Sequence, residues 1–157
     1  MIRTGLGFDI HPLVDGGPLR LGCVEIPWDR HLSGHSDGDC AAHAVADALL
    51  SAALSTDLGT VFPTNEANKG RSGASILKRT AELLKDHSCK IANIDLSILC
   101  DQPKLADYLE GMRKAIARHL GIKETDVTVK ARHLEGLFPP TGIAAVATVL
   151  ITGGDNG

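Results

Sequence analysis

Hydrophobic and polar positions recur along the chain with two different periods. Alternation, or a short run of apolar and β-branched residues, predicts strands, and a period of three to four residues or a longer apolar run predicts helices. The predicted strands cover residues 2–10, 19–26, 94–100, 127–131 and 143–151, the second bent as a hairpin at Gly22-Cys23. The predicted helices cover residues 41–54, 76–84 and 105–116, the first beginning near Asp37-Gly38-Asp39 and the last ending before Gly121.

Strands separated by helices favour an α/β fold of the α+β type, in which a mixed β-sheet is covered by helices on one face. Residues 1–157 contain no repeat and no linker, so we predict a single domain. The strand Ile143–Ile151 is apolar at nearly every position. Both of its faces should therefore be covered, in part by a neighbouring subunit.

The polar segment Asp57–Ser75 lies between the first two predicted helices and has little periodicity. It is rich in glycine, proline and asparagine, the residues that favour turns. A segment this long without regular structure is uncommon in a small domain, and such loops are often functional or mobile. We therefore expect a functional or mobile loop here.

Composition and charge exclude several classes of partner. Aromatic residues make up 3% of the chain and apolar residues 43%, so aliphatic side chains and alanine must form the core. The net charge of −3 and the pI near 6.1 provide no basic face for nucleic acid. No stretch reaches the roughly 20 apolar residues of a membrane span. We expect neither nucleic acid nor a membrane as partner.

The four cysteines, Cys23, Cys40, Cys89 and Cys100, are widely spaced and form no CxxC pair. This pattern is typical of free, buried thiols in a reducing compartment. The N-terminus lacks the long apolar core of a signal peptide. We therefore predict a cytoplasmic protein, or one of a plastid-like organelle.

Three residues are candidates for a metal site. Asp9 and His11 are two apart in a predicted strand, so their side chains point to the same side. His43 lies in the alanine-rich helix, where its ring needs a polar partner. One interpretation is a core histidine bonded to a backbone carbonyl. The other joins His43 to Asp9 and His11 as the ligands of a catalytic zinc ion with one open position.

Two aspartates precede this helix and allow two interpretations. Asp37 or Asp39 can cap the helix N-terminus, where an acidic residue is favourable. Asp39 is also four residues before His43 on the same helical face, and could instead orient the imidazole. The sequence leaves both interpretations open.

Five motifs occur along the chain in a fixed order. They are Gly7-Phe8-Asp9-Ile10-His11, His35-Ser36-Asp37-Gly38-Asp39 with His43, Asp57-Leu58-Gly59 with Phe62-Pro63, Gln102-Pro103-Lys104, and Val129-Lys130-Ala131 with Glu135. Together they resemble the 2-C-methyl-D-erythritol 2,4-cyclodiphosphate synthase family, and the resemblance spans nearly the whole chain. The length and the order of elements agree with this family.

The resemblance implies a phosphorus–oxygen lyase of isoprenoid precursor biosynthesis by the non-mevalonate (MEP) pathway. Members of the family convert 4-diphosphocytidyl-2-C-methyl-D-erythritol 2-phosphate into 2-C-methyl-D-erythritol 2,4-cyclodiphosphate and CMP. The 2-phosphate attacks the β-phosphorus, CMP leaves, and no water is consumed. Members form homotrimers with active sites between subunits, so a cytidine diphosphate substrate and two further copies of the chain are the implied partners.

The resemblance also implies roles for individual residues. Zinc would be bound by Asp9, His11 and His43, and magnesium or manganese by Glu135 together with the phosphates. The catalytic residues would be His35, which stabilises the transition state, and Glu135. The substrate would contact Asp9, His11, His35, Ser36, Asp57, Gly59, Phe62 and Pro63, and its cytidine portion would contact Pro103 and Lys104.

The last motif departs from the family pattern. The family has a Thr-Thr-Glu stretch where this chain has His133-Leu134-Glu135, and its Arg-Gly-Glu element is missing here. Because that element lines an isoprenoid diphosphate cavity on the trimer axis in some relatives, we predict no such ligand. The threonine that contacts the phosphates in the family is replaced here by His133, and Arg132 or His133 could supply the missing hydrogen-bond donor.

These departures leave an alternative function open, a non-catalytic trimeric zinc-binding relative that binds a nucleotide or phosphorylated ligand. A metallophosphatase is less well supported, because no residue is evidently placed to activate water.

Overall fold

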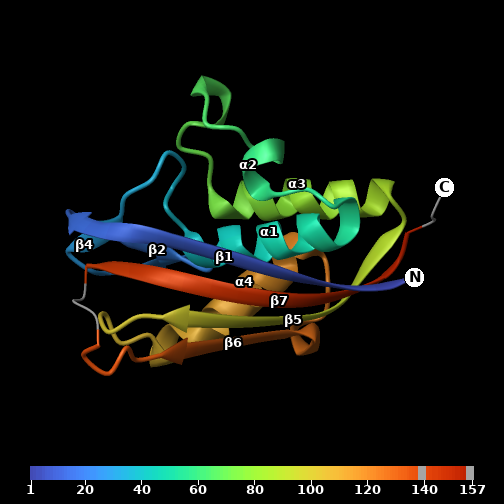
Figure 1. Ribbon diagram of the computed structural model, residues 1–157. Helices are drawn as coiled ribbons and strands as arrows, with labels where there is room; N and C mark the ends of the chain where they lie inside the picture. The colour runs from blue at the N-terminus through green and yellow to red at the C-terminus, as the bar shows by residue number, and fades with distance from the viewer. Residues whose placement is uncertain (138–140, 155–157) are drawn as a thin grey trace.

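A mixed five-stranded sheet forms the centre of the protein, whose computed structural model describes residues 1–137 and 141–154 (Figure 1). The strand order is β4-β1-β7-β5-β6, with β5 and β6 parallel and the other neighbours antiparallel. These strands are β1 (Ile2–Asp15), β4 (Arg30–Leu32), β5 (Cys89–Leu99), β6 (Val127–Arg132) and β7 (Gly142–Gly153). The predicted mixed sheet with helices is confirmed.

The helices cover one face of this sheet (Figure 1). The buried helix α1 (Cys40–Leu54) packs on β1 and β7, α3 (Gly73–Asp86) packs on α1, and α4 (Leu109–Leu120) packs on β6. Four short helices complete the described elements: α2 (Leu58–Val61), η1 (Glu66–Asn68), η2 (Ala106–Tyr108) and η3 (Glu124–Asp126). Within the described residues no helix combines the length and the apolar character that a membrane span requires.

The predicted hairpin is confirmed as β2 (Leu19–Leu21) and β3 (Val24–Ile26), which form a separate two-stranded sheet. Gly22 and Cys23 make its turn with φ values of 59° and 62°. These left-handed values belong to the tight two-residue turn that joins antiparallel strands. The hairpin matters for the site because it packs beside the N-terminus of α1.

The first strand is longer than predicted, because β1 continues through Pro12 to Asp15. Pro12 stands where the partner of β1 changes from β7 to β4. The amide of Leu13 donates to Thr141 on the β7 side. Amide directions alternate along a strand, so the missing N–H of Pro12 faces away from β7 and removes no bond to it.

Two glycines let the backbones of β1 and α1 touch. A Cβ added at Gly7 would lie 2.6 Å from the backbone nitrogen of Ala48 and closer still to the carbonyl oxygen of Ala44. Gly5 meets the carbonyl of Ala48 in the same way. Only glycine permits so close an approach. The contact brings the strand that carries Asp9 and His11 directly against the helix that carries His43.

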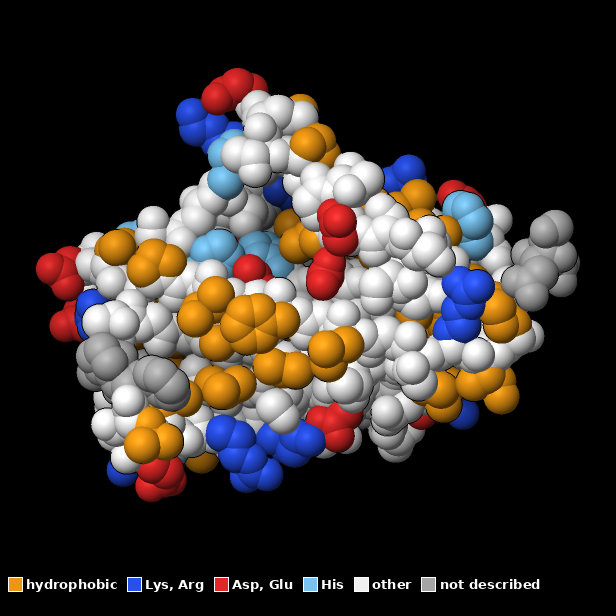
Figure 2. Space-filling model, in the orientation of Figure 1, with side chains coloured by type: hydrophobic (Ala, Val, Ile, Leu, Met, Phe, Trp, Pro, Cys, Tyr) orange, Lys and Arg blue, Asp and Glu red, His pale blue; other side chains and the backbone are white. Residues whose placement is uncertain are grey.

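The face of the sheet opposite the helices is apolar and open. Ile2, Leu6, Phe8 and Ile10 of β1 are exposed there, and Figure 2 shows a continuous hydrophobic patch across this face. In β7, buried residues alternate with half-buried ones, and Thr148 is exposed. The prediction that both faces of this strand are covered therefore holds for one face within a single chain.

Candidate active site

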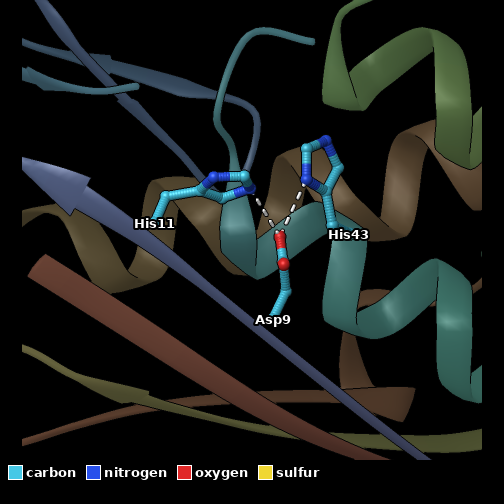
Figure 3. Close-up of side chains that lie close together, drawn as sticks. All are labelled: Asp9, His11 and His43. Carbon is cyan, nitrogen blue, oxygen red and sulfur yellow. Dashed lines mark hydrogen bonds and ion pairs between the residues drawn. The ribbon is translucent and has the colours of Figure 1, made fainter. Parts of the chain in front are cut away.

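Asp9, His11 and His43 converge at the junction of β1 and α1. The Oδ2 atom of Asp9 lies 3.0 Å from Nε2 of His11 and 2.9 Å from Nδ1 of His43. Figure 3 shows both rings directed at the carboxylate, one from the strand and one from the helix. One ligand atom from each residue lies within 4.8 Å of the other two. Two imidazoles and one carboxylate at this spacing fit a metal site with an open position.

The outer nitrogens of both rings are held by the surrounding chain. His11 Nδ1 lies 2.9 Å from the carbonyl oxygen of Ser33, so it carries a proton and donates. His43 Nε2 lies 3.2 Å from the hydroxyl of Ser36 and 3.7 Å from a carboxylate oxygen of Asp37. A proton on the outer nitrogen of His11 leaves its inner nitrogen available as a ligand when a metal is bound, which is the usual arrangement behind metal-bound histidines. His43 is therefore not a core histidine bonded to a backbone carbonyl.

The carboxylate of Asp9 and the imidazole of His11 shift each other's pKa. Burial by itself would raise the pKa of Asp9, but hydrogen bonds from His11 and His43 and the attraction to both rings lower it to about 2. The hydrogen bond to Asp9 raises the pKa of His11, against the opposing effect of burial. Asp9 is thus ionised across the physiological range, as a metal ligand must be.

We expect His11 to titrate above its usual pKa of 6.5 in the metal-free protein. Because the folded-state pKa is raised, protonation of His11 stabilises the fold fully below about pH 6.5, and this contribution is lost as the pH rises through the folded pKa. Metal affinity should change in the opposite sense, since the ion competes with the proton. NMR titration of the imidazole measures this pKa. A value at or below 6.5 that Asp9→Asn leaves unchanged would contradict the assignment.

A cavity of about 200 Å³ opens beside the triad. It contains four further residues that the sequence singled out, namely His35, Ser36, Gly59 and Phe62. The remaining lining residues are Leu58, Thr64, Asn68, Arg71 and Ile76. The segment Asp57–Ser75, which the sequence predicted to be a functional or mobile loop, therefore forms much of this wall.

Two other candidates in that segment do not line the cavity. Asp57 is exposed and caps α2 by accepting the amide of Thr60 at 2.7 Å, which also lowers the pKa of its carboxyl. Pro63 accepts a hydrogen bond from the side chain of Asn68 through its carbonyl oxygen. In this conformation both residues shape the loop, and neither touches the triad cavity.

Pro103 and Lys104 lie in a different cavity, of about 310 Å³, which also contains Arg132 and His133. The two cavities share no lining residue. Glu135 is exposed, with φ of 53°, and lines neither cavity. Within one chain, most residues singled out by the sequence therefore line one of two separate cavities, and Asp57, Pro63 and Glu135 line neither.

Asp101 anchors the segment that departs from the family pattern. Its Oδ1 atom accepts the amide of Leu134 at 2.6 Å and lies 3.0 Å from Nδ1 of His133. His133 therefore already has a partner on one ring nitrogen. Residues 138–140, which belong to the region of the missing Arg-Gly-Glu element, lie outside the described residues.

The two aspartates before α1 have different tasks. Asp39 is fully buried and caps the helix through the amide of Ala42, while it also accepts the amides of Gly22 and Cys23 at 2.7 Å. Burial raises the pKa of its carboxyl. Capping is confirmed, whereas the idea that Asp39 orients the His43 ring is wrong because its oxygens face the hairpin turn. Besides Asp9, the carboxylate within ion-pair distance of the His43 ring is Asp37.

Several contributing residues were missed by sequence reasoning. Ser33 and Asp101 act through contacts with segments that lie far away in the sequence. Asp47, which the sequence left unassigned, accepts the amide of Leu58 at 2.9 Å and thereby joins α1 to the start of α2. Arg71 carried no signal at all, since an arginine in a polar loop is ordinary.

Comparison with known proteins identifies the family of this chain. Residues 2–152 match the model of the YgbB family. The chain belongs to the YgbB family. Among curated relatives, the 2-C-methyl-D-erythritol 2,4-cyclodiphosphate synthases of Gemmatimonas aurantiaca and Salinibacter ruber are 41% and 44% identical to it. These alignments cover 98% and 96% of this chain and 96% and 98% of the relatives.

Solved structures of similar proteins have the same fold. A 2C-methyl-D-erythritol-2,4-cyclodiphosphate synthase in its CDP-bound form gives a TM-score of 0.88 at 32% identity, over 96% of this chain and 100% of that one. The bifunctional IspDF from Campylobacter jejuni gives 0.91 at 33% identity, over 96% of this chain and 42% of the longer one. The mixed sheet with its covering helices is thus shared with proteins of known structure.

Proposed function

We propose that this chain is a 2-C-methyl-D-erythritol 2,4-cyclodiphosphate synthase. It would convert 4-diphosphocytidyl-2-C-methyl-D-erythritol 2-phosphate into the 2,4-cyclodiphosphate and CMP. The observation that carries the proposal is the convergence of Asp9, His11 and His43 in one cavity with His35 and Ser36. Similarity to curated synthases over almost the whole chain supports the same conclusion.

In this reaction an oxygen of the 2-phosphate forms a bond to the β-phosphorus. The bond from the β-phosphorus to the bridging oxygen breaks, and that oxygen leaves with CMP. The protein must hold two anionic groups in line and stabilise the charge that grows between them. His35 and Ser36 would contact the phosphates, and the metal triad would orient these phosphates. Gly59 and Phe62 would contact the methylerythritol portion, with Asp57 and Pro63 shaping the loop.

Zinc is the metal that the triad suits best, because two imidazoles and one carboxylate leave a fourth tetrahedral position for a phosphate oxygen. Zinc bound there would act as a Lewis acid that polarises the phosphate. A magnesium or manganese ion would be bound by the diphosphate oxygens and by Glu135, since oxygen ligands are preferred by these ions. Glu135 is exposed and free to reach such an ion.

A homotrimer would reunite the two groups of site residues. Pro103 and Lys104, in the second cavity, would bind the cytidine portion. The CDP-bound form of a related synthase supports a cytidine nucleotide as the ligand. This requires that the second cavity of one subunit faces the triad cavity of the next. The exposed apolar residues Leu6, Phe8 and Ile10 supply a surface for such an assembly. We further propose a single domain and a cytoplasmic location, in keeping with four free cysteines.

Incubation of the purified, zinc-loaded protein with the substrate and magnesium tests the proposal. We expect release of CMP in equal amount to the cyclic product, both measured by chromatography, and no activity without divalent metal. A zinc-loaded protein that binds CDP but releases no CMP would instead establish the alternative, a non-catalytic relative. Cyclic product also separates the lyase from a phosphatase, which would form inorganic phosphate.

A further inference from the structure

The triad cavity has one permanently charged cation among its described lining residues, Arg71. The nearby lysine, Lys69, is paired with Glu66 at 3.5 Å and does not line the cavity. The wall otherwise carries the ionised Asp9, three histidines, other polar groups and apolar side chains. The positive charge of Arg71 makes the binding of an anion in this cavity more favourable.

The backbone around Arg71 is tied to the segment that carries His35. The amide of Gly70 donates to the carbonyl of His35 at 2.9 Å, and the amide of Asp37 donates to the carbonyl of Arg71 at 3.2 Å. Two residues farther along, at the start of α3, the amide of Gly73 donates to the carboxylate of Asp37 at 2.8 Å. These bonds fix the Cα atom of Arg71 relative to His35, Ser36 and the metal triad.

The side chain of Arg71 is held without a charged partner. Its guanidinium carbon lies 5.3 Å from the centroid of the Phe62 ring. Stacking on an aromatic ring occupies the face of the guanidinium and leaves the N–H groups at its edge free to donate. Within the part of the chain that the structure describes, no carboxylate is within ion-pair distance of this side chain. The carboxylates of Asp9 and Asp37 are themselves bonded to imidazoles and backbone amides.

We propose that Arg71 binds a phosphoryl oxygen of the substrate in the triad cavity, with Phe62 holding the guanidinium in place for this contact. The identity of the substrate rests on the proposed function, whereas the ligand chemistry, a phosphate or diphosphate, follows from the cavity itself. Arginine presents paired N–H groups that match two phosphate oxygens. In a partly enclosed site this contact is stronger than in water. Arg71 is therefore a substrate-contacting residue that none of the sequence motifs includes.

Phe62 is held in position beside Arg71 by hydrogen bonds of the backbone. Its amide donates to the carbonyl of Leu58 at 2.8 Å and ends the short helix α2. The Leu58 amide is itself bonded to Asp47 of α1. The backbone of Phe62 is thus connected, through α2, to the same helix that carries His43. A purely structural clasp between Arg71 and Phe62 is the competing explanation, and it predicts a loss of stability rather than a loss of anion binding.

Steady-state kinetics of Arg71→Gln and Arg71→Lys test the proposal. We expect Arg71→Gln to lower kcat/KM by about 10- to 100-fold, the usual effect of losing one hydrogen-bonded charge contact, with partial recovery in Arg71→Lys. Lys69→Gln is the matched control, because it removes a neighbouring cation outside the cavity, and it should stay within about twofold of the wild type. Zinc content and thermal midpoint should be unchanged in all three variants.

Calorimetry with inorganic pyrophosphate and the zinc-free protein provides a readout independent of turnover. We expect Arg71→Gln to weaken pyrophosphate binding at least about tenfold, with a shallower dependence on salt. Wild-type affinity in Arg71→Gln, or a fall in thermal midpoint that accounts for the whole loss, would overturn the proposal. If the wild type releases no CMP, the proposed function fails, whereas the pyrophosphate comparison still decides the role of Arg71.

Discussion

Replacing His43 by alanine is expected to lower the affinity for zinc by at least about 100-fold. His43 is 3% exposed, and its Nδ1 atom faces the same carboxylate oxygen as Nε2 of His11. Its removal leaves two ligands where a catalytic site needs three. Changes behind a metal ligand already cost 10- to 100-fold in affinity, so the loss of a ligand itself should cost more. Competition with a chromophoric chelator measures the affinity.

Two further variants make this result interpretable. His11→Ala removes a more accessible ligand and should reduce zinc affinity with a smaller disturbance of packing. His87→Ala removes an exposed histidine at the end of α3, whose ring bonds to the carbonyl of Leu83, and should bind zinc as the wild type does. Circular dichroism in the presence of chelator reports whether each variant is folded. A folded His43→Ala protein with full zinc occupancy at wild-type affinity would remove His43 from the ligand set.

Replacing Gly7 by alanine should destabilise the protein by about 3 kcal/mol or more. The added methyl group would overlap the backbone of α1 at Ala44 and Ala48, and backbone atoms cannot move aside as the end of a flexible side chain can. The helix and the strand would have to separate. Because Asp9 and His11 lie on that strand and His43 on that helix, zinc affinity should fall together with stability. Urea denaturation in the presence of chelator measures the stability without the contribution of bound metal.

Gly111→Ala is the matched control for this change. Gly111 lies in the first turn of α4, and an added Cβ would meet only the Val24 side chain at 3.7 Å, an ordinary contact. The same substitution should therefore stabilise the protein by roughly 0.5–1 kcal/mol, because alanine favours a helix over glycine. Equal effects at both positions would show that the contact between β1 and α1 is not as close as described.

The helices and central strands could be predicted well because their signals are local. The apolar run from Ala41 to Leu54 is long enough to exclude a strand, and the alternating residues of β5 and β6 have the two-residue period of a half-buried sheet. The strand β4, of three residues, was missed because so short a strand has no period to detect. The end of β1 was misplaced because proline usually ends a strand, and the exchange of partners at Pro12 is a tertiary event.

The candidate site was predictable only in part. Asp9 and His11 could be paired because a strand places alternate side chains on one side. Asp39 was given a possible role beside His43 because helical spacing is the only geometry that a sequence offers. In the structure the hairpin turn at Gly22-Cys23 attracts that carboxylate, and Asp37 lies beside the ring instead.

The sequence by itself determined most of the longer elements, the metal-ligand candidates and the family they resemble, since each depends on spacing within a short stretch of chain. The tertiary structure alone decided three further features. It joined Asp9 to His43 across a contact that two glycines permit, and it divided most of the predicted site residues between two cavities. It also placed Arg71 in the triad cavity, against the ring of Phe62. The physical reason is that these contacts join segments far apart in sequence, whose meeting depends on the packing of the whole core.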